Sequence, residues 1–112
     1  MNSSIVIALP KIDDAKKIRT ILNRHGFSVA AVCSTASTAL ASMSELDGGI
    51  LICGYKLTDR YYQDVLEDIP SYFEMLLLAS GRVIAEAPTS VLTVEMPMKV
   101  SDLVNTVDMM LS

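Results

Sequence analysis

Five short apolar runs alternate along the chain with segments that mix polar and apolar residues. The runs cover residues 5–8, 27–33, 49–54, 74–80 and 91–95, and they consist mainly of Val, Ile, Leu, Ala and Met. Continuous apolar runs of this length are typical of strands that are buried on both faces of a sheet. The pattern therefore predicts five parallel strands.

The segment after the first run has apolar residues at spacings of three and four, which is the period of a helix. Its buried face is predicted to consist of Ala15, Ile18, Ile21 and Leu22. We expect Asp13 to cap the N-terminus of this helix, because a short acidic side chain accepts hydrogen bonds from free backbone N–H groups. We expect Gly26 to end it, since glycine readily adopts the left-handed conformation that terminates helices.

Further helices are predicted after the second, third and fifth runs. Either Ser34 or Thr35 is the expected cap of the second helix, residues 60–68 form the third, and Ser101 is the expected cap of the last. Only ten residues, 81–90, separate Ser80 from the fifth run. This length is too short for a full helix and two loops, so we expect a reduced fourth helix.

Strands that alternate with helices through short connections predict an α/β fold. The expected architecture is a doubly wound, five-stranded parallel sheet that is covered on both faces through right-handed crossovers. A length of 112 residues suits a single domain spanning residues 1–112. Because only 5% of the residues are aromatic, the core must consist mostly of aliphatic side chains and methionine.

Charge and hydropathy narrow the possible partners. No apolar run approaches the roughly 18 residues that span a bilayer, and the first residues lack the pattern of a signal peptide. We therefore expect a cytoplasmic protein without membrane contacts. The formal net charge is −4 and most basic residues are scattered, so we expect no direct binding of nucleic acid by this domain.

The Cys and His residues do not form a reactive group. Cys33 and Cys53 belong to strands expected to flank the first strand, which separates their Cα atoms by roughly 9 to 10 Å, beyond disulfide reach. We interpret both as buried free thiols. The single histidine, His25, lies beside Gly26, where it suits a helix C-terminus. We expect no metal and no cofactor.

Four stretches carry a resemblance to a known family. They are IVIALPK with the following helix that ends in RHGFSV, then GILICGYKLTD, LLLASG and VLTVEMPMKVSDLV. With these stretches the chain resembles the receiver (CheY-like) domain of two-component response regulators over essentially its full length. The resemblance implies a flavodoxin-like sheet of strand order 2-1-3-4-5. In receivers, the proline at the position of Pro97 usually follows a cis bond.

The same resemblance implies that the phosphorylation site is degenerate. In receivers, an acidic pair and an aspartate bind Mg²⁺, that aspartate accepts the phosphoryl group, and a lysine and a hydroxyl respond to it. The matching positions here hold, in that order, Leu9, Pro10, Gly54, Met96 and Ser80. Leucine and proline cannot ligate a cation, and glycine cannot accept a phosphoryl group. The resemblance thus implies a pseudo-receiver that has no catalytic residue and is not an enzyme.

Three other acidic residues lie near these positions. Asp13 and Asp14 fall in the expected first turn of a helix, where carboxylates interact with free N–H groups and with the positive end of the helix dipole. We prefer this interpretation to a displaced Mg²⁺ pair. Asp59 matches an acidic residue in the loop of receivers, and we interpret it as a helix cap.

The resemblance implies a signalling role that is independent of phosphorylation. Degenerate sites of this kind are similar to those in regulators of the ANTAR type, in which an RNA-binding helical domain follows and acts in transcription antitermination. We therefore expect a signalling or dimerisation module in the N-terminal part of a longer regulator. The expected partner is another protein or a second copy, with a homodimer formed through the fifth strand and the last helix. Val83, Ile84 and Met98 are expected to be uncovered there.

One alternative function comes from another class. The crevice at the carboxyl ends of the strands is the usual ligand site of open α/β sheets, and here it is expected to be bounded by Leu9, Gly54, Tyr55, Ser80 and Met96. This rim is largely apolar, so the chain would be a sensor of an apolar small molecule. A cavity of ligand size favours this alternative, whereas a filled rim favours the module without a ligand.

Overall fold

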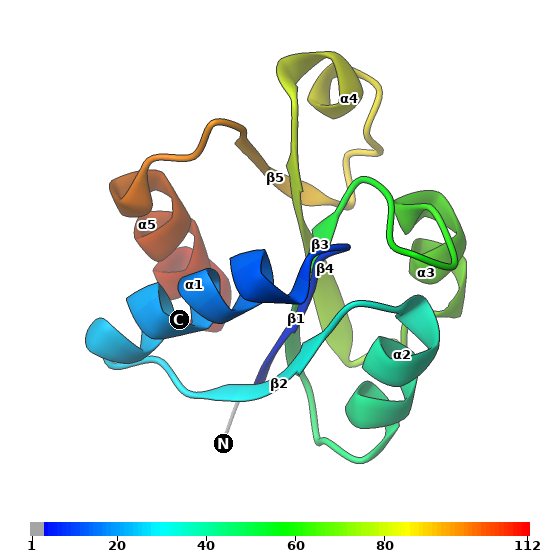
Figure 1. Cartoon of the computed structure of the whole chain (residues 1–112), viewed down its shortest axis with the longest axis horizontal. Helices are drawn as coiled ribbons and strands as arrows, with labels where there is room; N and C mark the ends of the chain where they lie inside the picture. Colours follow the sequence, from blue (N-terminus) through cyan, green and yellow to red (C-terminus); the bar gives the residue numbers. More distant parts are fainter. Residues whose placement is uncertain (1–3) are drawn as a thin grey trace.

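One parallel sheet separates two layers of helices in the computed structural model, which describes residues 4–112 (Figure 1). The strand order is β2-β1-β3-β4-β5 and every pairing is parallel, which confirms the predicted architecture. The strands are β1 (Ser4–Ala8), β2 (Val29–Cys33), β3 (Gly49–Gly54), β4 (Phe73–Ala79) and β5 (Leu92–Glu95).

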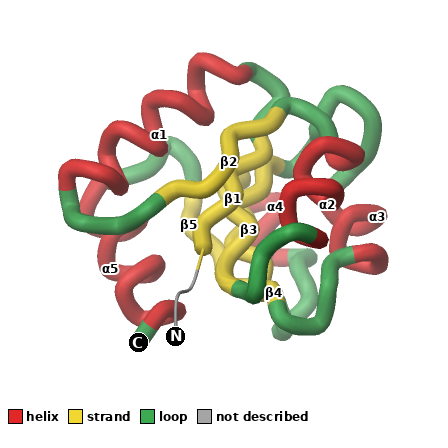
Figure 2. The backbone as a smooth tube through the Cα atoms, turned by 90° about the horizontal axis from the view of Figure 1, so that it is seen from below, coloured by secondary structure: helices red, strands yellow, loops and turns green. Residues whose placement is uncertain are grey.

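The helices divide unequally between the two faces of the sheet, as Figure 2 shows from below. On one face lie α1 (Ile12–Arg24) and α5 (Val100–Leu111). The other face carries α2 (Ala36–Ser44), α3 (Tyr62–Asp68) and α4 (Gly81–Ala85). The fourth helix has only five residues, so the reduced helix predicted from the short segment 81–90 is confirmed.

The alternation of side chains along the central strands supplies both layers with a core. Ile5 and Ile7 pack with α1 and α5, whereas Val6 and Ala8 point to the opposite layer, where α2 lies. All four of these side chains are fully buried. Burial on both faces explains why β1 and β3 are continuous apolar runs in the sequence.

Two predicted helix caps are wrong. The first helix begins at Ile12 with Lys11 at the N-cap position, and the last begins at Val100 with Lys99 there. Neither lysine makes a side-chain cap bond; the backbone carbonyls of Lys11 and Lys99 accept the first helical N–H bonds instead. Asp13 and Ser101 therefore lie inside the first turn, where Asp13 interacts with the helix dipole but caps nothing.

Other predicted helix ends are confirmed. Thr35, one of the two candidates, caps α2 by accepting a hydrogen bond from the backbone N–H of Thr38 at 3.1 Å. Gly26 ends α1 with a φ of +87°, and the His25 side chain makes a 2.9 Å contact through Nδ1 with the carbonyl of Ile21. The imidazole therefore lies at the carbonyl end of the helix, as its position in the sequence indicated.

We expect Gly49→Ala to destabilise the fold more than Gly26→Ala. A Cβ at Gly49, where φ is +149°, would overlap the backbone of Ser4 on the neighbouring strand, whereas a Cβ at Gly26 meets open space. The first substitution should lower the free energy of unfolding by more than about 2 kcal/mol, and the second by about 1 kcal/mol. Urea denaturation followed by circular dichroism measures both. Equal losses would show that the close approach of β1 and β3 does not require glycine.

Candidate functional site

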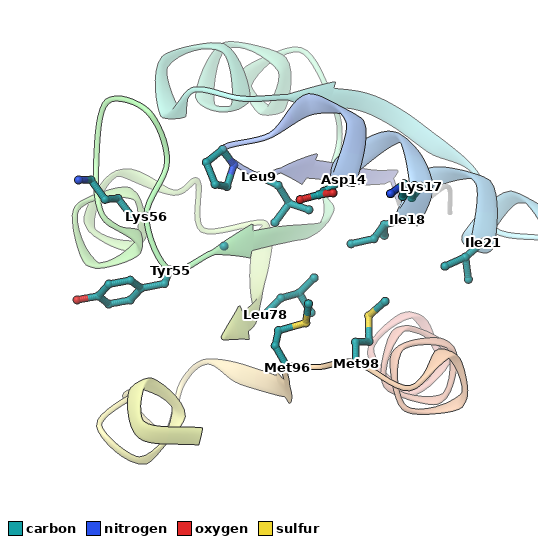
Figure 3. A pocket seen from close by; sticks show the side chains of 12 residues that line it. Leu9, Asp14, Lys17, Ile18, Ile21, Tyr55, Lys56, Leu78, Met96 and Met98 are labelled. Carbon is teal, nitrogen blue, oxygen red and sulfur yellow. The ribbon is translucent and has the colours of Figure 1, made fainter. Parts of the chain in front are cut away.

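A cavity of about 520 Å³ lies at the carboxyl ends of β1, β3 and β4, on the side of the sheet covered by α1 and α5 (Figure 3). Most of its wall is aliphatic or thioether surface, from Leu9, Pro10, Ile18, Ile21, Leu78, Met96 and Met98. The remaining lining residues are Gly54, Tyr55, Lys56, Asp14 and Lys17. The volume falls within the range typical of small-molecule sites.

Four of the five positions that match the receiver phosphorylation site line this one cavity. Leu9 and Pro10 follow β1, Gly54 ends β3, and Met96 follows β5. Ser80 lies outside the lining, exposed at the N-cap position of α4. The crevice predicted from the strand ends is therefore present, but its rim does not include the one hydroxyl that matches the family pattern.

The space beside Gly54 is occupied by hydrocarbon. A Cβ placed on Gly54 would lie 3.2 Å from Leu9 Cδ2 and 3.4 Å from Pro10 Cδ. These contacts are tighter than ordinary packing, so a longer side chain at residue 54 would have to displace its neighbours. The donor set does not fit Mg²⁺, which requires oxygen ligands, because the residues at the three matching ligand positions carry no side-chain oxygen. Across residues 4–112, no three His, Cys, Asp or Glu side chains gather as a metal site.

Asp14 and Lys17 bring charge to the cavity from α1. They are three residues apart and therefore share a face of the helix, and Figure 3 shows both at the cavity wall. In the described part of the chain they form no ion pair with each other. Lys56 is directed away from the cavity, with its ammonium 5.3 Å from the centre of the Tyr61 ring. Positions 14, 17, 18 and 21 form one stripe along α1 and mark this wall in the sequence. The helical period predicts an inward position only for the apolar members, Ile18 and Ile21.

Residues 55–62 fold back on themselves instead of extending the helix. Tyr62 N donates to the carbonyl of Tyr55 at 2.9 Å, and Leu57 N donates to the carbonyl of Arg60 at 2.7 Å. The Leu57 side chain is only 1% exposed and anchors the loop in the core beside α2. The sequence predicts a start of α3 at residue 60. These bonds explain why the helix begins at Tyr62 instead.

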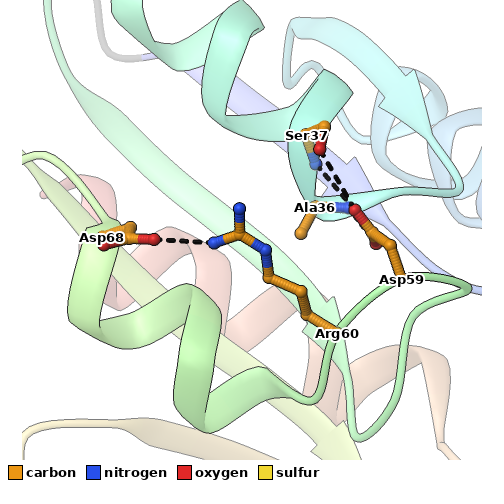
Figure 4. A network of polar contacts seen from close by, with 5 residues as sticks. All are labelled: Ala36, Ser37, Asp59, Arg60 and Asp68. Carbon is orange, nitrogen blue, oxygen red and sulfur yellow. Dashed lines mark hydrogen bonds and ion pairs between the residues drawn. The ribbon is translucent and has the colours of Figure 1, made fainter.

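Asp59 joins this loop to α2 (Figure 4). Its carboxylate accepts hydrogen bonds from Ala36 N at 2.7 Å, from Ser37 N at 3.1 Å and from Ser37 Oγ at 3.2 Å. The interpretation of Asp59 as a helix cap is thus confirmed, but the helix lies 23 residues earlier in the sequence and is not the adjacent α3. The Thr58 hydroxyl reinforces the junction by donating to the carbonyl of Ser34 at 3.1 Å.

The two cysteines are free and buried, as predicted. Both lie in register with Ala8, Cys33 on β2 and Cys53 on β3, on opposite sides of β1. Burial raises the pKa of the Cys53 thiol to about 12 and also raises the pKa of Cys33. Both therefore remain protonated near neutral pH, which makes them poor nucleophiles.

No family model matches the sequence, and no curated protein matches it. Solved structures do match. An anti-anti-sigma factor, PhyR from Bartonella quintana, superposes with a TM-score of 0.81 at 15% identity, covering 99% of this chain and 48% of that one. A member of a novel family of redox sensors in the streptococci, evolved from two-component response regulators, gives 0.80 at 17% identity, covering 97% and 51%.

A receiver domain (CheY-like) from Methylobacillus flagellatus gives a TM-score of 0.81 at 12% identity, covering 98% of this chain and 99% of that one. The chain spans about half the length of the first two matched structures and nearly all of this third one. At such identities the likeness establishes the fold. The Met96–Pro97 peptide bond, whose state the sequence left open, is cis. In residues 4–112 no helix has the length and apolarity to cross a membrane. The chain has the receiver (CheY-like) fold of the flavodoxin type.

We expect Asp59→Ala to destabilise the fold by about 1 kcal/mol at neutral pH, because two N–H groups at the start of α2 lose their acceptor. The hydrogen bond from Ala36 N, followed by those involving Ser37, lowers the pKa of Asp59. A depressed pKa stabilises the fold at pH values above the unfolded pKa, and this stabilisation disappears as the pH falls through the folded one. The difference between wild type and variant should therefore shrink below about pH 4.

The measurement is urea unfolding over a pH series, with Asp47→Ala as the matched control. Asp47 is also an exposed aspartate, and no side-chain hydrogen bond involves it in the described chain. Its replacement should change the free energy of unfolding by less than about 0.5 kcal/mol. A loss at Asp59 no larger than at Asp47 would contradict the capping role.

Proposed function

We propose that this chain is a receiver-fold signalling module that works without aspartyl phosphorylation at the usual position and is not an enzyme. One observation carries the proposal: the position of the phosphoacceptor is Gly54, and the side chains of Leu9 and Pro10 pack against it. Residue 54 offers a phosphoryl group no attachment point, the matching metal-ligand positions carry no side-chain oxygen, and the position of the receiver lysine holds Met96. The scaffold is therefore retained without the chemistry it supports in phosphorylated receivers.

The ionisable groups at the cavity support a non-enzymatic role. Asp14 and Lys17 lie on exposed positions of one helix, and Lys56 interacts with an aromatic ring. Neither arrangement places a base beside a nucleophile, and the two thiols are buried and protonated. The matched structures are consistent with signalling without this chemistry, since one of them is described as a redox sensor that evolved from response regulators.

The output we propose is contact with another protein or with a second copy of the chain. β5 is an edge strand of four residues, and Leu92 on it is 37% exposed. Met96 and Val100, which follow it, are 42% and 44% exposed, and Met109 on α5 is 58% exposed. Exposed apolar side chains next to an unpaired strand edge favour association, so we propose a homodimer through β5 and α5.

The resemblance to ANTAR-type regulators supports a role in transcription antitermination. In that role we propose that a second domain or a partner contacts the nucleic acid. The net charge of −4 does not suit a surface that binds phosphate backbones. The domain itself would then supply regulation, through what it binds and how it assembles. A second candidate function, small-molecule sensing in the crevice, is favoured by the cavity of about 520 Å³.

We expect the purified chain to keep its mass when it is incubated with acetyl phosphate and Mg²⁺. The reason is that residue 54 has no side-chain oxygen to accept a phosphoryl group. Intact-mass spectrometry measures the result, and a phosphorylatable receiver domain treated in parallel shows that the donor is active. The gain of one phosphoryl group by this chain would refute the proposed function.

We expect the chain to dimerise, and Leu92→Glu to weaken the dimer at least about tenfold by placing a charge at the edge of β5. Light scattering over a concentration series measures the mass. Ile12→Glu is the matched control, because Ile12 is also 37% exposed but lies at the start of α1, directly after β1, which is three strands away from β5 in the sheet. A monomer mass at every concentration, or equal effects of both variants, would contradict the proposed interface.

A further inference from the structure

We propose that the cavity binds a free amino acid with a large apolar side chain, as a zwitterion. This inference rests on the proposed function, because the crevice can take a ligand as its input only where phosphorylation does not use it. The proposed ligand differs from the one expected from the sequence: the apolar rim predicts an apolar molecule, whereas an amino acid also carries two charges. The cavity lining also includes a charged pair on α1, Asp14 and Lys17.

The deeper wall suits a branched, aromatic or thioether side chain. Ile18 and Leu78, both at most 5% exposed, form fixed aliphatic surfaces from α1 and β4. Met96 and Met98, in the loop after β5, close the side that lies across from α1 (Figure 3). Methionine side chains are unbranched and adapt to ligands of different shape, so this wall can accept several apolar side chains.

The mouth offers one negative and one positive group to the ligand. The carboxylate of Asp14 and the ammonium of Lys17 lie about one helical turn apart on the same face of α1 and are not paired with each other. An α-ammonium group can bind Asp14 while the α-carboxylate binds Lys17. Both contacts are hydrogen bonds between charged groups, which are stronger than neutral ones.

Other charge types fit this mouth less well. A monocarboxylate would pair with Lys17 but would bring a second negative charge close to Asp14, and a simple amine would have the opposite conflict. A hydrocarbon would take water away from both side chains and replace none of their hydrogen bonds. Lys56 does not add a second positive charge to the mouth, because its ammonium lies over the Tyr61 ring and is directed away from the cavity.

The test is a titration of the full chain, followed by backbone amide resonances in NMR spectra. The probes are L-leucine, L-methionine and L-phenylalanine. Isocaproate and isoamylamine are the matched controls, since they are leucine without its ammonium group and leucine without its carboxylate. We expect saturable shifts of residues in α1 and around Met96 with at least one amino acid, and affinities at least about tenfold weaker for both controls.

Substitutions on α1 locate the charges. Asp14→Asn and Lys17→Gln should each weaken binding of the amino acid about tenfold or more, because each removes a hydrogen bond between charged groups. Asp13→Asn and Lys16→Gln are the matched controls: both side chains are exposed on the same helix but do not line the cavity. These should change the affinity less than about twofold.

The inference fails if none of the three amino acids shifts a resonance up to about 10 mM, or if isocaproate or isoamylamine binds as tightly as leucine. It also fails if the control substitutions weaken binding as much as those at Asp14 and Lys17. These failures would leave the proposed function intact as long as acetyl phosphate leaves the mass unchanged. A phosphorylated chain would instead overturn the proposed function, whatever the titration gives.

Discussion

The packing of Leu9 and Pro10 against Gly54 shapes the carboxyl ends of the central strands, and both proposals depend on it. Leu9 is held in place by its backbone, whose N–H donates to the carbonyl of Cys33 at 3.1 Å, and its side chain is 8% exposed. The two side chains fill the space beside residue 54 with hydrocarbon. The same hydrocarbon then forms one wall of the cavity that remains on the α1 side.

Hydrogen bonds within the protein hold the β3–α3 loop. Asp59 binds the start of α2, Thr58 binds Ser34, and Leu57 is buried beneath them. This connection is formed entirely by side chains and backbone groups of the protein. Met96 and Met98, in the segment between β5 and α5, also line the cavity.

The fold was predictable because burial on both faces of a parallel sheet leaves a strong local signal. Runs such as residues 49–54 are apolar throughout, and the stripe of α1 has a helical period. Cap residues were predicted less well, because the backbone conformation of Lys11 and Lys99 decides where each helix begins. The contact of Asp59 with Ala36 joins residues distant in sequence, and the role of Asp14 and Lys17 depends on which side of α1 faces a cavity.

The position of the cavity links the proposed dimer to the proposed binding of an amino acid. Met96 and Met98 belong to the segment that connects β5 to α5, the two elements proposed to form the dimer. A ligand that orders these methionines would also fix the edge at which a second copy binds. Such coupling is reciprocal: if the ligand changes the affinity between two copies by some factor, dimerisation changes the affinity for the ligand by the same factor. Coupling of this kind would need no phosphoryl group, since differential contact of the proposed amino acid with the two states would supply the free energy.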